Sequence, residues 1–292
     1  MVSELKGLGV ALITPFEKDG SVDFSSLQKL VKKCIKGGAN YLVVLGTTGE
    51  TPTLTKEEKK EILKAVVEYN EGAIPLVAGF GGNNTLEIIE DLKSFDTNGY
   101  SYILSASPYY NKPNQEGIYQ HYKTIAKEAP LPIILYNVPG RTGSNMLPET
   151  TLKLAREIEN IVAIKEASGN IDQCMKLVKN KPKEFIVLSG DDNLVVSQMA
   201  IGVEGCISVI GNLLPEEFSK MIHQCLNNEY DAARLTQLKL LEIIDLIFEE
   251  GNPVGIKTAL HLQNICLDSV RLPLVKGSAT LRERIKKAMI QI

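Results

Sequence analysis

Eight short apolar segments alternate with amphipathic segments along most of this chain, and this alternation limits the folds open to it. Each apolar segment is continuous and is bounded by glycine, proline or polar residues, which is typical of strands buried on both faces of a parallel sheet. The predicted strands are 9–14, 41–46, 74–79, 100–105, 132–137, 161–168, 185–190 and 205–210.

The segments between the predicted strands place apolar residues at helical spacing. The segment Thr55-Lys-Glu-Glu58 also has the pattern of a capping box, which starts a helix. The predicted helices are 23–38, 55–69, 85–97, 115–129, 148–158, 171–179, 193–201 and 215–227.

Eight βα units in a chain of 292 residues match the (β/α)8 TIM barrel, an α/β fold. A doubly wound open sheet is the competing fold, and it usually carries a glycine-rich dinucleotide turn after its first strand. The corresponding turn here is Ile13-Thr-Pro-Phe16, which lacks that pattern. The sequence therefore predicts a barrel.

The chain changes character after residue 227, because no further strand pattern occurs. Segments 231–249, 253–263 and 279–290 show helical spacing, and no low-complexity linker precedes them. We expect two units: residues 1–227 as the barrel with the active site, and residues 228–292 as a three-helix C-terminal extension packed on the barrel.

Lys165 is the one lysine inside a predicted strand. Alternation along that strand places it on the same face as Ile161, Ala163 and Ala167. Lysine is rarely buried without a partner, and burial of an unpaired ammonium favours the neutral amine. A neutral lysine amine attacks carbonyl carbons and forms Schiff bases. The alternative is that Lys165 lies at a strand end and extends its ammonium to solvent.

Other polar residues follow the predicted strands, at the barrel face where TIM-barrel enzymes carry their chemistry. Structural roles are open for each of them: the threonines could cap a helix, the tyrosines could pack, and the two aspartates could cap the helix that follows. The segments are Gly46-Thr-Thr-Gly-Glu50, Ser107-Pro-Tyr-Tyr-Asn-Lys-Pro113, Tyr136-Asn-Val-Pro-Gly-Arg-Thr142 and Ser189-Gly-Asp-Asp192.

Composition excludes several classes of function. A net charge of −3 gives no sign of nucleic-acid or anionic-membrane binding. The N-terminus lacks the apolar core of a signal peptide, and no apolar run approaches the ~20 residues that span a bilayer, so we expect a cytoplasmic protein. The five cysteines and three histidines lack metal-site spacing, so we expect free thiols and no metal. The loops after strands seven and eight carry no lysine or arginine, which favours a substrate without phosphate.

Three of these motifs together resemble one known family. Gly46-Thr-Thr-Gly-Glu50, Tyr136-Asn-Val-Pro-Gly-Arg-Thr142 and Ile164-Lys-Glu-Ala-Ser168 are similar to segments of the dihydrodipicolinate synthase and N-acetylneuraminate lyase family of class I aldolases. The resemblance extends over the whole chain, including Asn252-Pro253. Arg141 and the pair Tyr109-Tyr110 are typical of the synthase branch of this family, so the chain resembles that branch.

The resemblance implies an enzyme that condenses pyruvate with L-aspartate-4-semialdehyde through a lysine Schiff base, on the diaminopimelate route to lysine. It implies no metal, nucleotide or vitamin cofactor. The catalytic residues implied are Lys165 as nucleophile, Tyr136 as proton shuttle, and Thr47 with Tyr110 as a relay. The substrate-binding residues implied are Thr48, Arg141, Gly190 and Ile207.

The resemblance also implies a homotetramer built from two tight dimers, in which Tyr110 reaches into the neighbouring active site. Lysine-inhibited members of the family commonly carry histidines at the positions of Lys56 and Lys59, so we expect weak or absent inhibition by lysine. Another pyruvate-dependent aldolase is the alternative enzyme, of the 2-keto-3-deoxygluconate or 4-hydroxy-2-oxoglutarate type. A non-enzymatic sensor is the alternative of a different class, and it would be expected to lose Lys165 or Tyr136.

Overall fold

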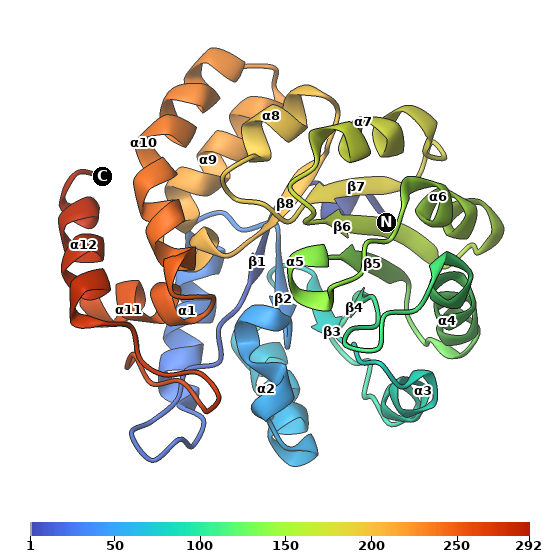
Figure 1. Cartoon of the computed structure of the whole chain (residues 1–292). Coiled ribbons are helices and arrows are strands. Elements are labelled where there is room, and N and C mark those ends of the chain that lie inside the picture. The colour runs from blue at the N-terminus through green and yellow to red at the C-terminus, as the bar shows by residue number, and fades with distance from the viewer. Residues whose placement is uncertain (1) are drawn as a thin grey trace.

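The structure is a computed structural model and describes residues 2–292. Eight parallel strands form a closed barrel in chain order, as predicted, and helices surround it (Figure 1). One strand lies at each of the eight predicted segments. The bounds differ most at β1, which was predicted at 9–14 and begins at Gly7. The strands are β1 Gly7–Ala11, β2 Tyr41–Val44, β3 Leu76–Gly79, β4 Tyr102–Ala106, β5 Ile133–Asn137, β6 Ile161–Glu166, β7 Ile186–Ser189 and β8 Gly205–Ser208.

Helices cover the outer wall of the barrel and match the predicted segments closely. The capping box is present, because Thr55 and Glu58 bond each other's backbone N–H at the start of α2. The helices that alternate with the strands are α1 Phe24–Lys36, α2 Lys56–Asn70, α3 Thr85–Lys93, α4 Gln115–Glu128, α6 Pro148–Glu157, α7 Ile171–Asn180, α8 Val195–Ala200 and α9 Pro215–Leu226.

Two local features differ from the predicted helices. Helix α3 ends at Lys93 rather than at residue 97, and Phe95 beyond its end packs edge-on against Phe80 and Tyr100. A short helix, α5 Pro139–Thr142, follows β5 in a segment where no helix was predicted. Proline at the first helical position suits this start, because its missing N–H has no intrahelical partner there.

Side chains inside the barrel and side chains on its outer wall form separate clusters. Ala163, Tyr136 and Leu188 belong to the inner cluster, whereas Ile164 faces outward. The expectation that Ile161 shares the inner face of β6 is wrong: Ile161 packs in the outer cluster. The register of β5 against β6 shifts between Ile161 and Ala163, so one extra residue reverses the alternation at that point.

The chain continues after α9 with α10 Tyr230–Glu249, α11 Val254–Leu262 and α12 Ala279–Ile290. These helices lie together on one side of the barrel (orange to red in Figure 1), and α10 packs against α8 and α9. We propose the boundary between barrel and extension in the turn between α9 and α10, at residue 228.

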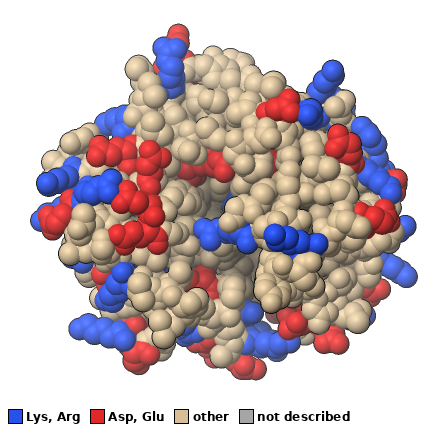
Figure 2. Space-filling model, viewed as in Figure 1, with Lys and Arg blue, Asp and Glu red and all other residues tan. Residues whose placement is uncertain are grey.

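The surface carries charges of both signs, interspersed over the face that Figure 2 shows. Acidic side chains gather there over the C-terminal helices, and basic ones lie near the middle of the view. All five cysteines are buried and free, as predicted. Within residues 2–292, no helix is both long and apolar enough to cross a membrane.

Candidate active site

Lys165 lies in the barrel interior, on β6, and only 5% of its surface is exposed. Its register partner on β5 is Tyr136, and Lys165 Nζ lies 4.4 Å from the centroid of the Tyr136 ring. Within residues 2–292 Lys165 forms no ion pair. The barrel therefore holds a buried amine against a phenol, and the aromatic ring face is its close neighbour instead of a carboxylate.

Gly190 directly follows β7 and provides the space that the Lys165 side chain occupies. A Cβ atom at this position would lie 2.9 Å from Lys165 Cε and 2.6 Å from Ala167 Cβ. Both distances are shorter than real Cβ contacts, so any side chain here would displace the amine. The family resemblance implied Gly190 as a substrate-binding residue, and in the structure the neighbours that an added Cβ would meet are Ala167 and Lys165.

Replacing Gly190 by alanine is therefore expected to slow imine formation by roughly 100-fold, because a displacement of about 1 Å at a reacting group costs this much. The rate of pyruvate-dependent borohydride labelling measures the effect. Gly82→Ala is the matched control, since a Cβ there meets Ile88 at an ordinary 3.6 Å. A Gly190→Ala rate equal to that of the control would show that Lys165 has room to spare.

The two threonines after β2 lie in a 3₁₀ turn, Thr47–Gly49, and do not cap a helix. Helix α2 takes its cap from Thr55, so the capping alternative for this pair is wrong. Thr48 is buried, and its hydroxyl oxygen accepts a hydrogen bond from Asn252 Nδ2 at 3.0 Å. Thr47 is half-buried. The turn thus presents two hydroxyl groups beside the barrel opening.

Three further predicted site residues lie in different surroundings. Arg141 is exposed on α5, and its Nη2 donates to the backbone oxygen of Asn252 at 3.5 Å. Ile207, on β8, is fully buried in the inner cluster. Tyr110 is 86% exposed, with a left-handed φ of 70°, and within this chain it makes no hydrogen bond to Lys165 or Tyr136. The single chain therefore brings Lys165, Tyr136 and Gly190 together but leaves Tyr110 apart.

Comparison with known proteins shows the family of this chain. The model of the dihydrodipicolinate synthetase family matches residues 4–292. This chain belongs to that family. The family member of Parabacteroides distasonis, a 4-hydroxy-tetrahydrodipicolinate synthase, is 52% identical over 288 residues, which cover 99% of this chain and 97% of that protein. The synthase of Azobacteroides pseudotrichonymphae is 54% identical, over 98% of this chain and 97% of that protein.

Solved structures of the family have the same fold. The dihydrodipicolinate synthase of Aquifex aeolicus superimposes with a TM-score of 0.95 at 39% identity, covering 98% of each chain. The chloride-inhibited enzyme of Acinetobacter baumannii, solved in complex with pyruvate, gives a TM-score of 0.95 at 40% identity, again over 98% of each chain.

A buried ion pair that was not predicted from the sequence fixes the threonine turn of this family member. Lys257 Nζ lies 2.5 Å from Glu50 Oε1, and both side chains are almost wholly inaccessible to solvent. Lys257 also donates to the Ser269 carbonyl at 2.9 Å, and the Arg271 N–H donates to Glu50 Oε2 at 2.9 Å. Burial lowers the pKa of Lys257, and Glu50 opposes that shift. The sequence signal was a single lysine within the apolar run of 254–260.

A second missed group lies behind Lys165, on the outward face of β6. The buried Glu166 carboxylate accepts hydrogen bonds from Asn137 Nδ2 at 3.0 Å, from Gln173 Nε2 at 2.9 Å and from Ser168 N–H at 2.8 Å. These bonds join β5, β6 and α7. Because Glu166 is the next residue after Lys165, they also hold the strand that carries the amine.

The aspartates after β7 tie loops together and do not cap a helix. Helix α8 begins after Leu194 and has no side-chain cap, so the capping alternative for Asp191 and Asp192 is wrong. Asp192 Oδ2 accepts from the N–H groups of Val209 and Ile210, at 2.9 and 2.8 Å. Burial raises the pKa of Asp191 to about 6 and also raises that of Asp192. These contacts hold the end of β8 beside the end of β7.

Proposed function

We propose that this protein catalyses the 4-hydroxy-tetrahydrodipicolinate synthase reaction, the condensation of pyruvate with L-aspartate-4-semialdehyde on the diaminopimelate route to lysine. The observation that carries the proposal is the buried Lys165 amine, 4.4 Å from the Tyr136 ring and without an ion-pair partner within residues 2–292. Similarity to curated synthases at about half of all positions, over nearly the full chain, supports the same reaction.

In this mechanism Lys165 attacks the keto carbon of pyruvate, and loss of water leaves an imine. Loss of a methyl proton gives the enamine, whose carbon adds to the aldehyde carbon of the second substrate. The amine of that substrate then attacks the imine carbon, which closes the ring and frees Lys165. The imine accepts the electron pair that the methyl proton leaves behind, and the enamine passes this pair to the aldehyde carbon in the addition, so the chemistry needs no other electron sink.

Tyr136 moves protons at the imine in this proposal, because its ring is the close neighbour of Lys165 Nζ. A phenol with an ordinary pKa near ~10 is a poor base at neutral pH and needs a relay to solvent. Thr47 and Tyr110 are proposed as that relay. Thr48 is proposed to bind the pyruvate carboxylate, and the backbone carbonyl of Ile207 is proposed as a further contact.

Arg141 is proposed to bind the carboxylate of the semialdehyde, since it is exposed on α5 and, among residues 2–292, its guanidinium makes one long hydrogen bond, of 3.5 Å. Arg141→Ala is expected to remove roughly 1.5–3 kcal/mol of binding, about ten- to a hundred-fold. The KM for the semialdehyde should rise by this factor, with little change for pyruvate. Equal effects on both KM values would mean that Arg141 organises the site in general.

Tyr110 is proposed to act in the active site of a second copy of the chain. Its exposure of 86%, together with that of Tyr109 beside it, leaves two aromatic side chains on one loop facing solvent, and exposed aromatic pairs are typical of interfaces. A two-fold contact would bring each loop to its neighbour.

Complementation tests this exchange. Lys165→Ala subunits mixed with Tyr110→Phe subunits should regain activity, because one site of each hybrid dimer would hold both intact residues. Activity that stays at the average of the two parents would mean that Tyr110 acts within its own chain.

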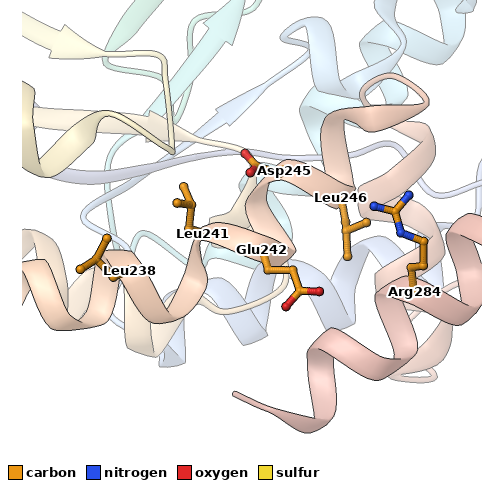
Figure 3. A pocket seen from close by; sticks show the side chains of 6 residues that line it. All are labelled: Leu238, Leu241, Glu242, Asp245, Leu246 and Arg284. Carbon is orange, nitrogen blue, oxygen red and sulfur yellow. The ribbon is translucent and has the colours of Figure 1, made fainter.

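The proposed homotetramer needs a second interface, and helix α10 offers an apolar surface for it. Leu235 and Leu238 are more than half exposed, and Leu241 continues the same side of the helix. Figure 3 shows Leu238 and Leu241 along α10, whereas Arg284 of α12 lies beside Leu246 at the other end of the same pocket. Burial of such a patch against its two-fold copy would join two dimers into a tetramer.

Lys56 and Lys59 line a cavity of about 590 Å³ between α2 and α3. Lys56 pairs with Asp91 at 2.8 Å, which offsets part of its charge, whereas Lys59 forms no ion pair within residues 2–292. Two ammonium groups repel by ~1 kcal/mol at about 4 Å in water. The ammonium of Lys59 would therefore repel a bound lysine molecule, which supports the proposal that lysine inhibits this protein weakly.

Turnover with pyruvate and a panel of aldehydes tests the proposed reaction. We expect L-aspartate-4-semialdehyde to give the highest kcat/KM. Preference for a sugar-derived aldehyde, or for glyoxylate, would instead assign the protein to one of the other pyruvate-dependent aldolases.

A further inference from the structure

Asn252, between α10 and α11, contacts both residues proposed to bind substrate carboxylates. Its Nδ2 donates to the Thr48 hydroxyl oxygen at 3.0 Å, and its backbone oxygen accepts from Arg141 Nη2 at 3.5 Å. Only 8% of Asn252 is exposed. The residue thus joins the turn after β2 to the short helix after β5, across the opening of the barrel.

The direction of the hydrogen bond between Asn252 and Thr48 determines whether the Thr48 hydroxyl is free to donate its own hydrogen. A hydroxyl group has one hydrogen to donate and can also accept. Because Thr48 Oγ1 accepts from the Asn252 amide, its own hydrogen is left for another acceptor. Among residues 2–292 no hydrogen bond donated by the Thr48 hydroxyl is found, and Asn252 Oδ1 is buried without a partner.

We propose that Asn252 is a positioning residue that directs the Thr48 hydroxyl hydrogen toward the pyruvate carboxylate. This inference rests on the proposed function, in which Thr48 binds that carboxylate. The amide also strengthens the donor, because a hydroxyl that accepts one hydrogen bond polarises and donates a stronger one.

The two contacts of Asn252 use different atoms, and this separates their effects. The side-chain amide contacts Thr48, whereas the backbone oxygen contacts Arg141. Replacing the side chain should therefore change the binding of pyruvate and leave Arg141 its acceptor. A residue that only stabilised the local fold would change the binding of both substrates.

The test compares Asn252→Ala and Asn252→Asp, each alone and combined with Thr48→Val. For each variant we would measure the KM of both substrates and the pyruvate concentration that gives half-maximal borohydride labelling. Asn227→Ala is the matched control, since Asn227 is exposed at the end of α9 and its side chain makes no hydrogen bond among residues 2–292.

Asn252→Ala is expected to raise the pyruvate KM about tenfold, the effect of one hydrogen bond, and to change the semialdehyde KM less than about threefold. Asn252→Asp should raise the pyruvate KM roughly 100-fold, because a carboxylate accepts the Thr48 hydrogen and repels the anion. With Thr48→Val present, Asn252→Ala should add less than about a twofold change.

Equal increases in both KM values, or an Asn252→Ala effect that persists in full beside Thr48→Val, would overturn the inference. If the Asn252→Ala variant fails to fold, the nearly isosteric Asn252→Asp variant is used for the same comparison. Its effect on the pyruvate KM should be about tenfold smaller when Thr48→Val is also present. An Asn252→Asp effect that is equally large with and without Thr48→Val would also overturn the inference. Absence of pyruvate labelling in the unmodified protein would instead contradict the proposed function.

Discussion

Lys165→Arg is expected to abolish synthase turnover, with kcat falling on the order of 10⁴-fold, because the covalent route through the imine is lost. Arginine keeps the positive charge but has no amine that can condense with a ketone, since its guanidinium stays protonated. The substitution therefore separates covalent catalysis from electrostatic attraction of the two carboxylate substrates. Steady-state turnover with both substrates measures the effect.

Lys29→Arg is the control for this change, because Lys29 is exposed on α1. It should leave kcat unaltered. A Lys165→Arg variant that kept more than about a tenth of the activity would mean that Lys165 acts by charge alone and that no imine is required.

Lys257→Met is expected to destabilise the fold by about 3–5 kcal/mol, the cost of leaving a buried carboxylate without its partner. The ammonium it removes contacts Glu50 Oε1 at 2.5 Å, and neither side chain reaches solvent appreciably. Urea unfolding should show a lower midpoint with an unchanged slope. The loss should also raise the pyruvate KM, since Glu50 ends the turn that carries Thr48.

Two comparisons separate the buried charge from other effects of this substitution. Lys257→Met combined with Glu50→Gln should recover part of the stability, because no unpaired charge then remains buried. Lys56→Ala breaks an exposed pair with Asp91 and should cost no more than about 1 kcal/mol. A Lys257→Met protein as stable as Lys56→Ala would show that the pair contributes nothing.

The barrel and the position of Lys165 were predictable because both follow from local periodicity. Short apolar segments with turn residues at their ends predict strands one at a time, and eight of them in alternation with helices leave few architectures. The same alternation placed Lys165 inside the barrel together with Ala163. It failed at Ile161, because a shift of register is a property of two paired strands and one strand's pattern does not reveal it.

The residues that support the site were not predictable in this way, because they act across long distances in the sequence. Glu50 and Lys257 are 207 positions apart, and Asn252 and Thr48 are 204 apart. Each pair meets only after the C-terminal helices pack on the barrel. Asp192 was expected at a helix start, yet its carboxylate binds the backbone of the next strand's loop, since tertiary contacts compete with local capping.

Covalent trapping of pyruvate shows directly whether Lys165 forms an imine. The protein is incubated with pyruvate and borohydride, which reduces an imine to a stable secondary amine, and the modified peptide is then identified by mass spectrometry. We expect one pyruvate-dependent adduct, on Lys165, and none in the Lys165→Arg variant. An adduct on any other lysine, or no adduct in the unmodified protein, would contradict it.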